Sequence, residues 1–76
     1  MGILIEIRKI REDRRAADYE FTLGERAGFV RMDKRTGAAI LIDVDPRDAM
    51  AFRCAARKLI DHWQKGEFPD RTSWAA

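Results

Sequence analysis

The side chains best suited to chemistry are a single cysteine and a single histidine, Cys54 and His62. They stand eight residues apart in a stretch with helical periodicity, which separates them by about 12 Å along a helix axis. A nucleophile and its general base must approach to about 3 Å, so these two cannot act together within one chain. One histidine and one cysteine also cannot build a His/Cys zinc site. The sequence predicts no metal site and no cofactor.

The carboxylates are numerous, but each occurs where a turn, a helix start or a strand surface accounts for it. The ones considered are Asp18, Glu20, Asp33, Asp45 and Asp48. Their spacing forces no two of them into one pocket. A glycine-rich phosphate loop is also missing, because neither Gly24 nor Gly28 precedes a predicted helix. We therefore expect a protein that is not an enzyme.

Length and composition limit the chain to one small domain, residues 1–76. Fifteen basic and thirteen acidic side chains leave a net charge of +2, a small excess for a protein that binds duplex DNA. A single cysteine makes no internal disulfide, although small secreted domains usually need several, so we expect a cytoplasmic protein. No apolar run approaches the roughly 20 residues of a membrane span, and we expect no membrane association.

The charge is unevenly distributed along the chain. Residues 8–15 and residues 47–65 each carry five basic and two acidic side chains, and the segment between them is acidic. One interpretation is a solvated surface with many salt bridges. The other is a pair of basic elements that meet around an anionic ligand. Both remain open at this point.

The first two-thirds of the chain alternates apolar and polar residues with a period of two, which indicates β-strands. The predicted strands span about 3–10, 17–23, 28–33 and 38–44. Ile10 is out of phase with Ile7, so either the first strand ends near Lys9 or a bulge resets the alternation. Short connections join the four strands, which favours an antiparallel meander.

A tight turn and a helix complete the prediction. In the segment 33–37, Gly37 suits the positive φ of a bulged hairpin, and Asp33 can accept hydrogen bonds from turn amides. A helix over about 46–65 is expected from an N-cap at Asp45, a proline at the first helical position and Gly66 at the end. Its apolar stripe consists of Ala49, Phe52, Ala56, Leu59, Ile60 and Trp63.

The predicted fold class is therefore α+β. A four-stranded antiparallel meander precedes one C-terminal helix, which packs on one face of the sheet in the order ββββα. The tail, residues 66–76, contains Phe68 and Trp74 and is expected to be anchored rather than frayed. Trp74 either closes the edge of a thin core or docks into a neighbouring subunit.

The sheet face that the helix leaves open is the expected interaction surface. We place Ile40 and Ile42 on the covered face and Leu4, Phe29 and Leu41 on the open face, where they form a modest apolar patch on adjacent strands. Together with Arg31 and Trp74 these three are the interface candidates. We therefore expect a non-catalytic interaction or oligomerisation module, which associates with another protein or with itself.

The simplest assembly of such a module is a two-fold homodimer, sheet face against sheet face. Arg31 would then lie near an acidic group of the partner. The rival arrangement pairs exposed edge strands and would bury little of Phe29.

A second function uses the same face to bind single-stranded nucleic acid. Phe29 would stack on a base, and Arg8, Arg31 and Lys34 would contact phosphates. The ββββα order resembles, in the order of its elements alone, the single-strand-binding coactivator and Whirly-type proteins. Acidic residues such as Asp18 and Glu20 border the same face and would repel phosphate. Nucleic acid is therefore the alternative and not the favoured partner.

The closing segment of the chain carries a further resemblance. The runs Ala56-Arg57-Lys58-Leu59, His62-Trp63, Lys65-Gly66-Glu67-Phe68-Pro69 and Thr72-Ser73-Trp74-Ala75 resemble the end of a group of small bacterial proteins with a strand-rich front. The resemblance implies a bacterial, cytoplasmic origin. It implies no catalytic or binding residue, because no activity is assigned to that group.

Overall fold

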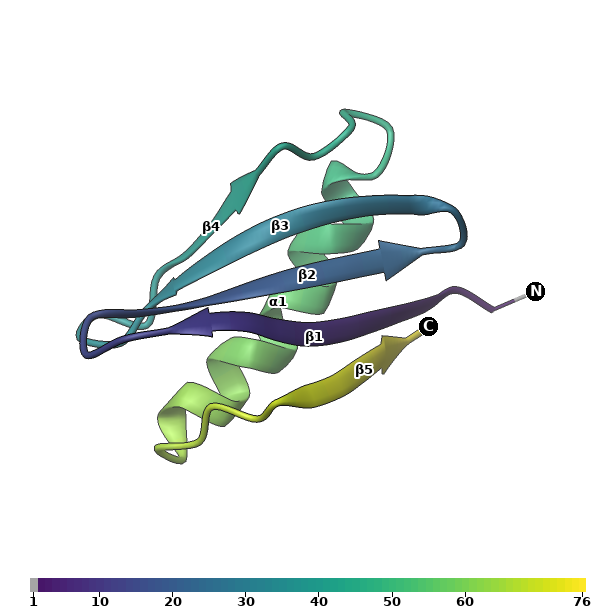
Figure 1. Ribbon diagram of the computed structural model, residues 1–76. Helices are drawn as coiled ribbons and strands as arrows, with labels where there is room; N and C mark the ends of the chain where they lie inside the picture. Colours follow the sequence, from purple (N-terminus) through teal and green to yellow (C-terminus); the bar gives the residue numbers. More distant parts are fainter. Residues whose placement is uncertain (1) are drawn as a thin grey trace.

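The alternating segments form strands and the apolar stripe forms a helix in the computed structural model, which describes residues 2–76 (Figure 1). Met1, the first residue of the predicted domain, lies outside the described residues. The elements are β1 (Leu4–Glu12), β2 (Ala16–Leu23), β3 (Arg26–Asp33), β4 (Ala39–Ile42), α1 (Ala49–Gln64) and β5 (Arg71–Ala75). The strands of this part of the chain make one antiparallel sheet in the order β4-β3-β2-β1-β5. The fold is α+β, with α1 across one face of the sheet.

The core lies between α1 and the face of the sheet that it covers. Its buried side chains are Ile5, Ile7, Ala17, Tyr19, Phe21, Val30, Met32, Phe52, Ala55, Ala56 and Leu59. Phe21 and Phe52 meet edge to face with ring centroids 5.7 Å apart, the geometry that aromatic quadrupoles favour. A Cβ at Gly28 would lie 2.5 Å from the Phe52 ring. Glycine at this position therefore allows the helix to approach the sheet.

In the strand region the structure decides between the two alternatives at Ile10 and confirms the predicted turn. The register of β1 against β2 shifts between Lys9 and Arg11, so a bulge at Ile10 resets the alternation. In the turn after β3, Gly37 has φ 77°, and a carboxylate oxygen of Asp33 accepts hydrogen bonds from the amides of Arg35 and Thr36 at 2.8 and 3.0 Å. The roles of Gly37 and Asp33 in this turn therefore follow from the sequence alone.

The predicted four-stranded sheet is incomplete, because the tail supplies a fifth strand. β5 pairs antiparallel with β1, and its Trp74 lies opposite Ile5 on the covered face. The sequence of β5, Arg-Thr-Ser-Trp-Ala, has a single large apolar residue and too little alternation to be recognised as a strand. Its pairing depends on the free edge that β1 offers, which is a tertiary feature.

The helix begins at Ala49 and not at Pro46. The Asp45 carboxylate accepts a hydrogen bond from the Arg47 amide at 2.9 Å, and the Asp45 carbonyl accepts one from the Asp48 amide at 2.8 Å. These two bonds close a separate turn, so Asp45 caps that turn and Asp48 stands at the helix N-cap. The Asp48 side chain does not cap the helix but accepts a hydrogen bond from Arg26 Nε at 2.7 Å. The predicted stop at Gly66 is confirmed by its φ of 74°.

The phase predicted for β4 is wrong. Leu41 lies opposite Val30 on the covered face and packs against the core, whereas Ile40 and Ile42 lie on the open face. Residues 38–42 are all apolar, so their pattern contains no polar residue to mark the solvent side. The turn sets the register instead, because it places Ala39 opposite the buried Met32.

Candidate functional site on the open sheet face

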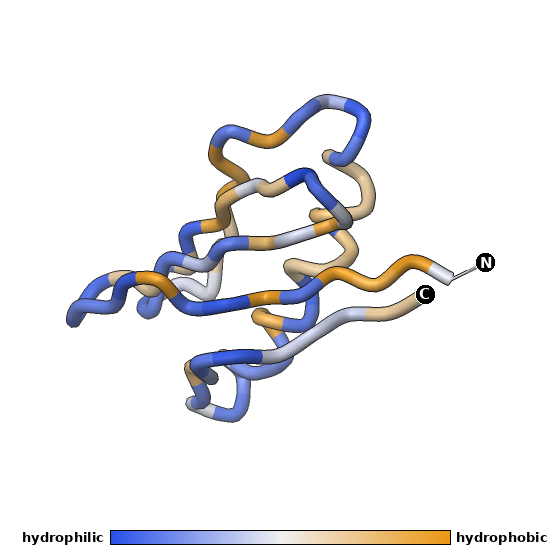
Figure 2. The backbone as a smooth tube through the Cα atoms, turned by 45° about the vertical axis from the view of Figure 1, so that its right-hand side comes forward, coloured by the Kyte–Doolittle hydropathy of each residue, from blue (hydrophilic) through white to orange (hydrophobic). Residues whose placement is uncertain are grey.

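The apolar part of the open face is concentrated beside one edge of the sheet. Phe29 of β3 is half-buried and lies directly opposite Ile42 of β4. Ile40 precedes Ile42 by two residues and lies on the same face of the sheet. Ile40 and Ile42 are 57% and 37% exposed. Figure 2 shows the hydrophobic β4 stretch between two hydrophilic loops. We call Phe29, Ile40 and Ile42 the β4 patch.

The predicted interface residues are brought together only in part. Leu4 is on the open face and 54% exposed, but β2 separates its strand from β3, so Leu4 does not join Phe29. Leu41 and Trp74 face the helix side and pack against the core. Arg31 lies on the open face opposite Ile40, next to the β4 patch. Sequence reasoning missed Ile40 and Ile42, because the apolar run did not reveal which of its residues face outward.

The charges of the open face form pairs between neighbouring strands. Arg31 donates two hydrogen bonds to the Asp18 carboxylate, from Nε at 2.9 Å and from a terminal nitrogen at 3.2 Å. Arg8 donates one to Glu20 at 2.9 Å. The hydrogen bonds from Arg31 to Asp18 also raise the pKa of Arg31. These arginines are therefore already neutralised by carboxylates within the sheet.

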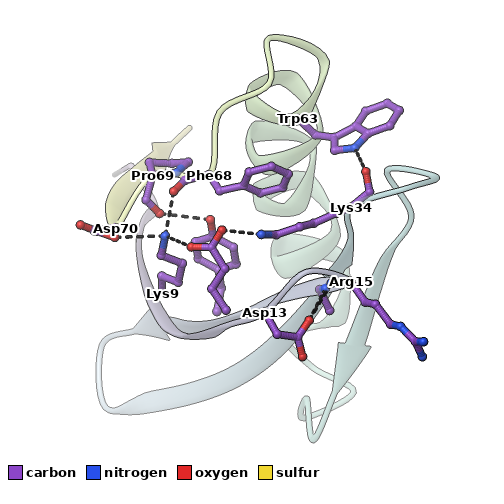
Figure 3. A network of polar contacts seen from close by, with 11 residues as sticks. Lys9, Asp13, Arg15, Lys34, Trp63, Phe68, Pro69 and Asp70 are labelled. Atoms are coloured by element: carbon purple, nitrogen blue, oxygen red, sulfur yellow. Dashed lines mark hydrogen bonds and ion pairs between the residues drawn. The ribbon is translucent and has the colours of Figure 1, made fainter.

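Lys34 does not lie with the other predicted phosphate contacts. Its Nζ is 2.5 Å from Glu12 Oε2 and 4.7 Å from the centroid of the Phe68 ring, and its carbonyl accepts a hydrogen bond from Trp63 Nε1 at 2.6 Å (Figure 3). These contacts hold Lys34 beneath the tail and the helix end. Of the four nucleic-acid candidates, Arg8, Phe29 and Arg31 share the open face and Lys34 is separate.

A polar network around Lys9 attaches the tail to the sheet (Figure 3). Lys9 Nζ lies 2.5 Å from Glu12 Oε1, 3.0 Å from the Phe68 carbonyl and 3.1 Å from Asp70 Oδ1. The hydrogen bond that Lys9 donates to Glu12 is the largest of the effects that raise the pKa of Lys9, and the hydrogen bonds from Lys34 and Lys9 lower the pKa of Glu12. Lys9 is therefore held as a cation, a state that suits an ion pair and not a nucleophile.

Tyr19 completes this attachment from inside the core. Its hydroxyl donates a hydrogen bond to the Pro69 carbonyl at 3.1 Å, and burial raises its pKa to about 12. Together with Lys9 it fixes the chain just before β5. The network accounts for the position of the fifth strand.

An open hollow of about 320 Å³ lies at the end of the open face, next to the β4 patch. Its lining residues are Arg11, Asp13, Arg15, Ala16, Asp18, Arg31, Asp33 and Ile40. Asp13 and Asp33 accept hydrogen bonds from backbone amides of their own turns, and these bonds lower the pKa of both carboxyls. Both stay ionised at neutral pH and act as turn caps. The three aspartates balance the three arginines, so the hollow is not a purely cationic site.

The two side chains best suited to chemistry, Cys54 and His62, both lie on α1. Cys54 is half-buried in α1. His62 Nδ1 lies 2.8 Å from Glu67 Oε1 across the helix end, and His62 Nε2 is buried with no hydrogen-bond partner among residues 2–76. No group of three or more His, Cys, Asp or Glu side chains in the described chain is arranged to hold a metal ion.

Comparison with protein-family models, with curated proteins and with solved structures finds no match to this chain. The resemblances noted in the sequence thus stay predictions. Within residues 2–76, α1 is neither long nor apolar enough to span a membrane. The site must be interpreted from its own geometry.

Proposed function

We propose that this protein is a non-catalytic interaction module that associates with a second copy of itself through the β4 patch. The observation that carries the proposal is the exposure of Ile40 and Ile42 beside the half-buried Phe29 at a sheet edge. Contiguous exposed apolar side chains are costly in water and typical of contact surfaces. A chain of this length also buries a limited core, so association adds stability that the monomer lacks.

The charges around the patch support a protein partner over nucleic acid. Binding to a nucleic-acid strand draws on cations that are free to displace counterions from phosphates. Arg8 and Arg31 instead neutralise Glu20 and Asp18, whose carboxylates would face an approaching phosphate. A rim of paired charges around an apolar centre is the arrangement found at protein interfaces. Single-stranded nucleic-acid binding keeps only Phe29 as an exposed stacking surface, and it remains the weaker alternative.

Sedimentation of charged variants tests the proposal. We expect the wild-type chain to dimerise at tens of micromolar and Ile40→Glu to sediment as a folded monomer, because a desolvated contact cannot accept an unpaired carboxylate. This variant places the new carboxylate opposite Arg31 and thus costs the monomer little.

The matched control is Leu4→Glu, a similarly exposed apolar residue on the same face but outside the patch. It should leave the dimer intact. A monomeric wild-type chain at 100 µM would contradict the proposal, as would equal effects of Leu4→Glu and Ile40→Glu. Titration of a fluorescent mixed oligonucleotide at low salt tests the alternative, and micromolar binding that Arg31→Ala weakens would favour it.

A further inference from the structure

The two edges of the sheet differ in how they are protected from pairing with another strand. The exposed edge strands of proteins usually carry charges or proline that discourage such pairing. The edge strand β5 reads Arg-Thr-Ser-Trp-Ala and contains one charged residue, Arg71. β4 reads Ala-Ile-Leu-Ile and contains neither a charge nor a proline. The β4 edge is thus the unprotected one.

The hydrogen bonds of the hairpin show which backbone groups of β4 face outward. The Asp33 amide donates to the Ala38 carbonyl at 2.8 Å, so this pair is hydrogen-bonded. In an antiparallel ladder hydrogen-bonded pairs alternate with non-bonded ones. Ile40 and Ile42 therefore bond to β3, while the N–H and C=O groups of Ala39 and Leu41 point away from the sheet. These groups are free to bond with another strand.

We propose that two copies of the chain join edge to edge through β4, antiparallel about a two-fold axis perpendicular to the sheet, and form one continuous sheet. This proposal rests on the proposed function and specifies its geometry. Centring the axis on Ile40 lets Ala39 and Leu41 exchange hydrogen bonds with the partner's Leu41 and Ala39. Centring it on Leu41 would require Asp43, whose φ of 52° lies outside the β region. The register at Ile40 is therefore favoured.

The same register brings the β4 patches of the two copies together. Ile40 lies opposite the partner's Ile40 as a non-hydrogen-bonded pair, the closest kind of cross-strand contact. Ile42 flanks this pair on each side of the axis, and Phe29 lies behind Ile42 on β3, one strand further from the partner. The Arg8–Glu20 and Arg31–Asp18 pairs then lie at the rim. In a face-to-face dimer they would lie at the centre, where their desolvation is costly.

The charges at the two ends of β4 also favour the antiparallel arrangement. The turn before β4 contains Arg35, and the segment after it contains Asp43. No ion pair joins Arg35 or Asp43 to another residue within residues 2–76. Antiparallel pairing brings the basic end of one copy beside the acidic end of the other. Parallel pairing would bring like charges together.

The test blocks one sheet edge at a time with proline. Ala39→Pro removes an outward N–H and leaves the bonds of β4 to β3 in place. Ser73→Pro is the matched control at the β5 edge. Ala76 and Ile3 exchange hydrogen bonds at 2.9 and 3.1 Å, so the alternation directs the Ser73 amide outward as well. We expect Ala39→Pro to sediment as a folded monomer at 100 µM and Ser73→Pro to remain a dimer.

Amide hydrogen exchange gives a second measurement that needs no variant. The amides of Ala39 and Leu41 should exchange more slowly in the wild-type chain as its concentration rises from 5 to 500 µM, whereas the amide of Ser73 should not change. This measurement decides the question if Ala39→Pro fails to fold. Protection that is independent of concentration at Ala39 and Leu41 would overturn the edge pairing.

The outcomes separate this proposal from the one on which it rests. If Ile40→Glu is monomeric and Ala39→Pro remains a dimer, the β4 patch is an interface but the edge pairing is wrong. Monomers for both proline variants would also overturn pairing specific to β4. A wild-type chain that is monomeric at 100 µM would overturn both proposals. If a different protein is the partner, the amides of Ala39 and Leu41 would become protected only after that protein is added. That result would overturn the proposal that the partner is a second copy of this chain.

Discussion

At the scale of single residues, Gly37 sets how the β3–β4 turn meets the end of α1. Its φ of 77° is a conformation that L side chains rarely adopt, and a Cβ there would lie 2.6 Å from the Trp63 ring. Trp63 also donates its indole N–H to the turn at the Lys34 carbonyl. The ring therefore rests on a surface that only glycine provides.

We expect Gly37→Ala to lower the free energy of unfolding through both backbone strain and steric overlap. Left-handed strain costs about 1 kcal/mol, and overlap in a packed contact costs about 1–3 kcal/mol more. Urea unfolding measures the sum. Gly24→Ala is the control, because Gly24 has φ 61° with nothing within 4 Å of the added Cβ. Equal losses for the two variants would show that the Trp63 contact contributes nothing.

Tyr19 makes the stability of the protein sensitive to alkaline pH. Burial raises its pKa from the ordinary value of 10 to about 12. The folded state therefore retains a neutral phenol at a pH where the unfolded chain ionises. The stability that this difference supplies is complete below pH 10 and is lost as the pH rises from 10 through about 12.

The variant Tyr19→Phe isolates this contribution. At pH 7 it should be less stable than the wild type by about 1 kcal/mol, because the hydrogen bond to the Pro69 carbonyl is lost. Between pH 10 and 12 the gap should narrow, since only the wild type carries the titrating phenol. Lys9, whose pKa is also raised, titrates in both chains and cancels from the comparison. A gap that stays constant from pH 8 to 12, measured by urea unfolding, would refute this assignment.

At the scale of elements, the sequence predicts the structure wherever a residue type permits only one local backbone conformation. The Asp33–Gly37 turn and the end of α1 at Gly66 follow from local geometry and are confirmed, and of the two alternatives at Ile10 the bulge is the one found. β5 was not predictable in this way. Its pairing depends on the free edge of β1 and on the contacts of Lys9 and Tyr19 with residues 68–70.

The candidate site was predictable only as a face of the sheet. Phe29 was assigned correctly, because polar neighbours mark the alternation of β3. Leu41 was assigned to the wrong side, and with it Ile40 and Ile42, because residues 38–42 offer no polar residue to fix the phase. The length of the turn decides that phase, and a shift of one residue reverses every side chain. Where a strand is uniformly apolar, its register must come from the turn that precedes it.

At the scale of the whole molecule, the two faces of the sheet differ in composition and in surroundings. The covered face and α1 enclose the core, and the tail is held against its margin by Lys9 and Tyr19. The open face is a sheet of paired charges with one apolar region beside β4. Net charge is small and the arginines nearest the patch are paired, so we expect shape and apolar contact, rather than long-range attraction, to select the partner.

Self-association must then appear in the stability of the protein. A dimer that forms only between folded chains shifts the folding equilibrium by mass action, so its unfolding midpoint rises with concentration. We expect the midpoint of thermal unfolding to increase between 10 and 500 µM for the wild type and for Ser73→Pro. Ala39→Pro and Ile40→Glu, as folded monomers, should unfold at the same temperature at both concentrations. Differential scanning calorimetry measures both quantities, and a wild-type midpoint independent of concentration would contradict association of the folded chain.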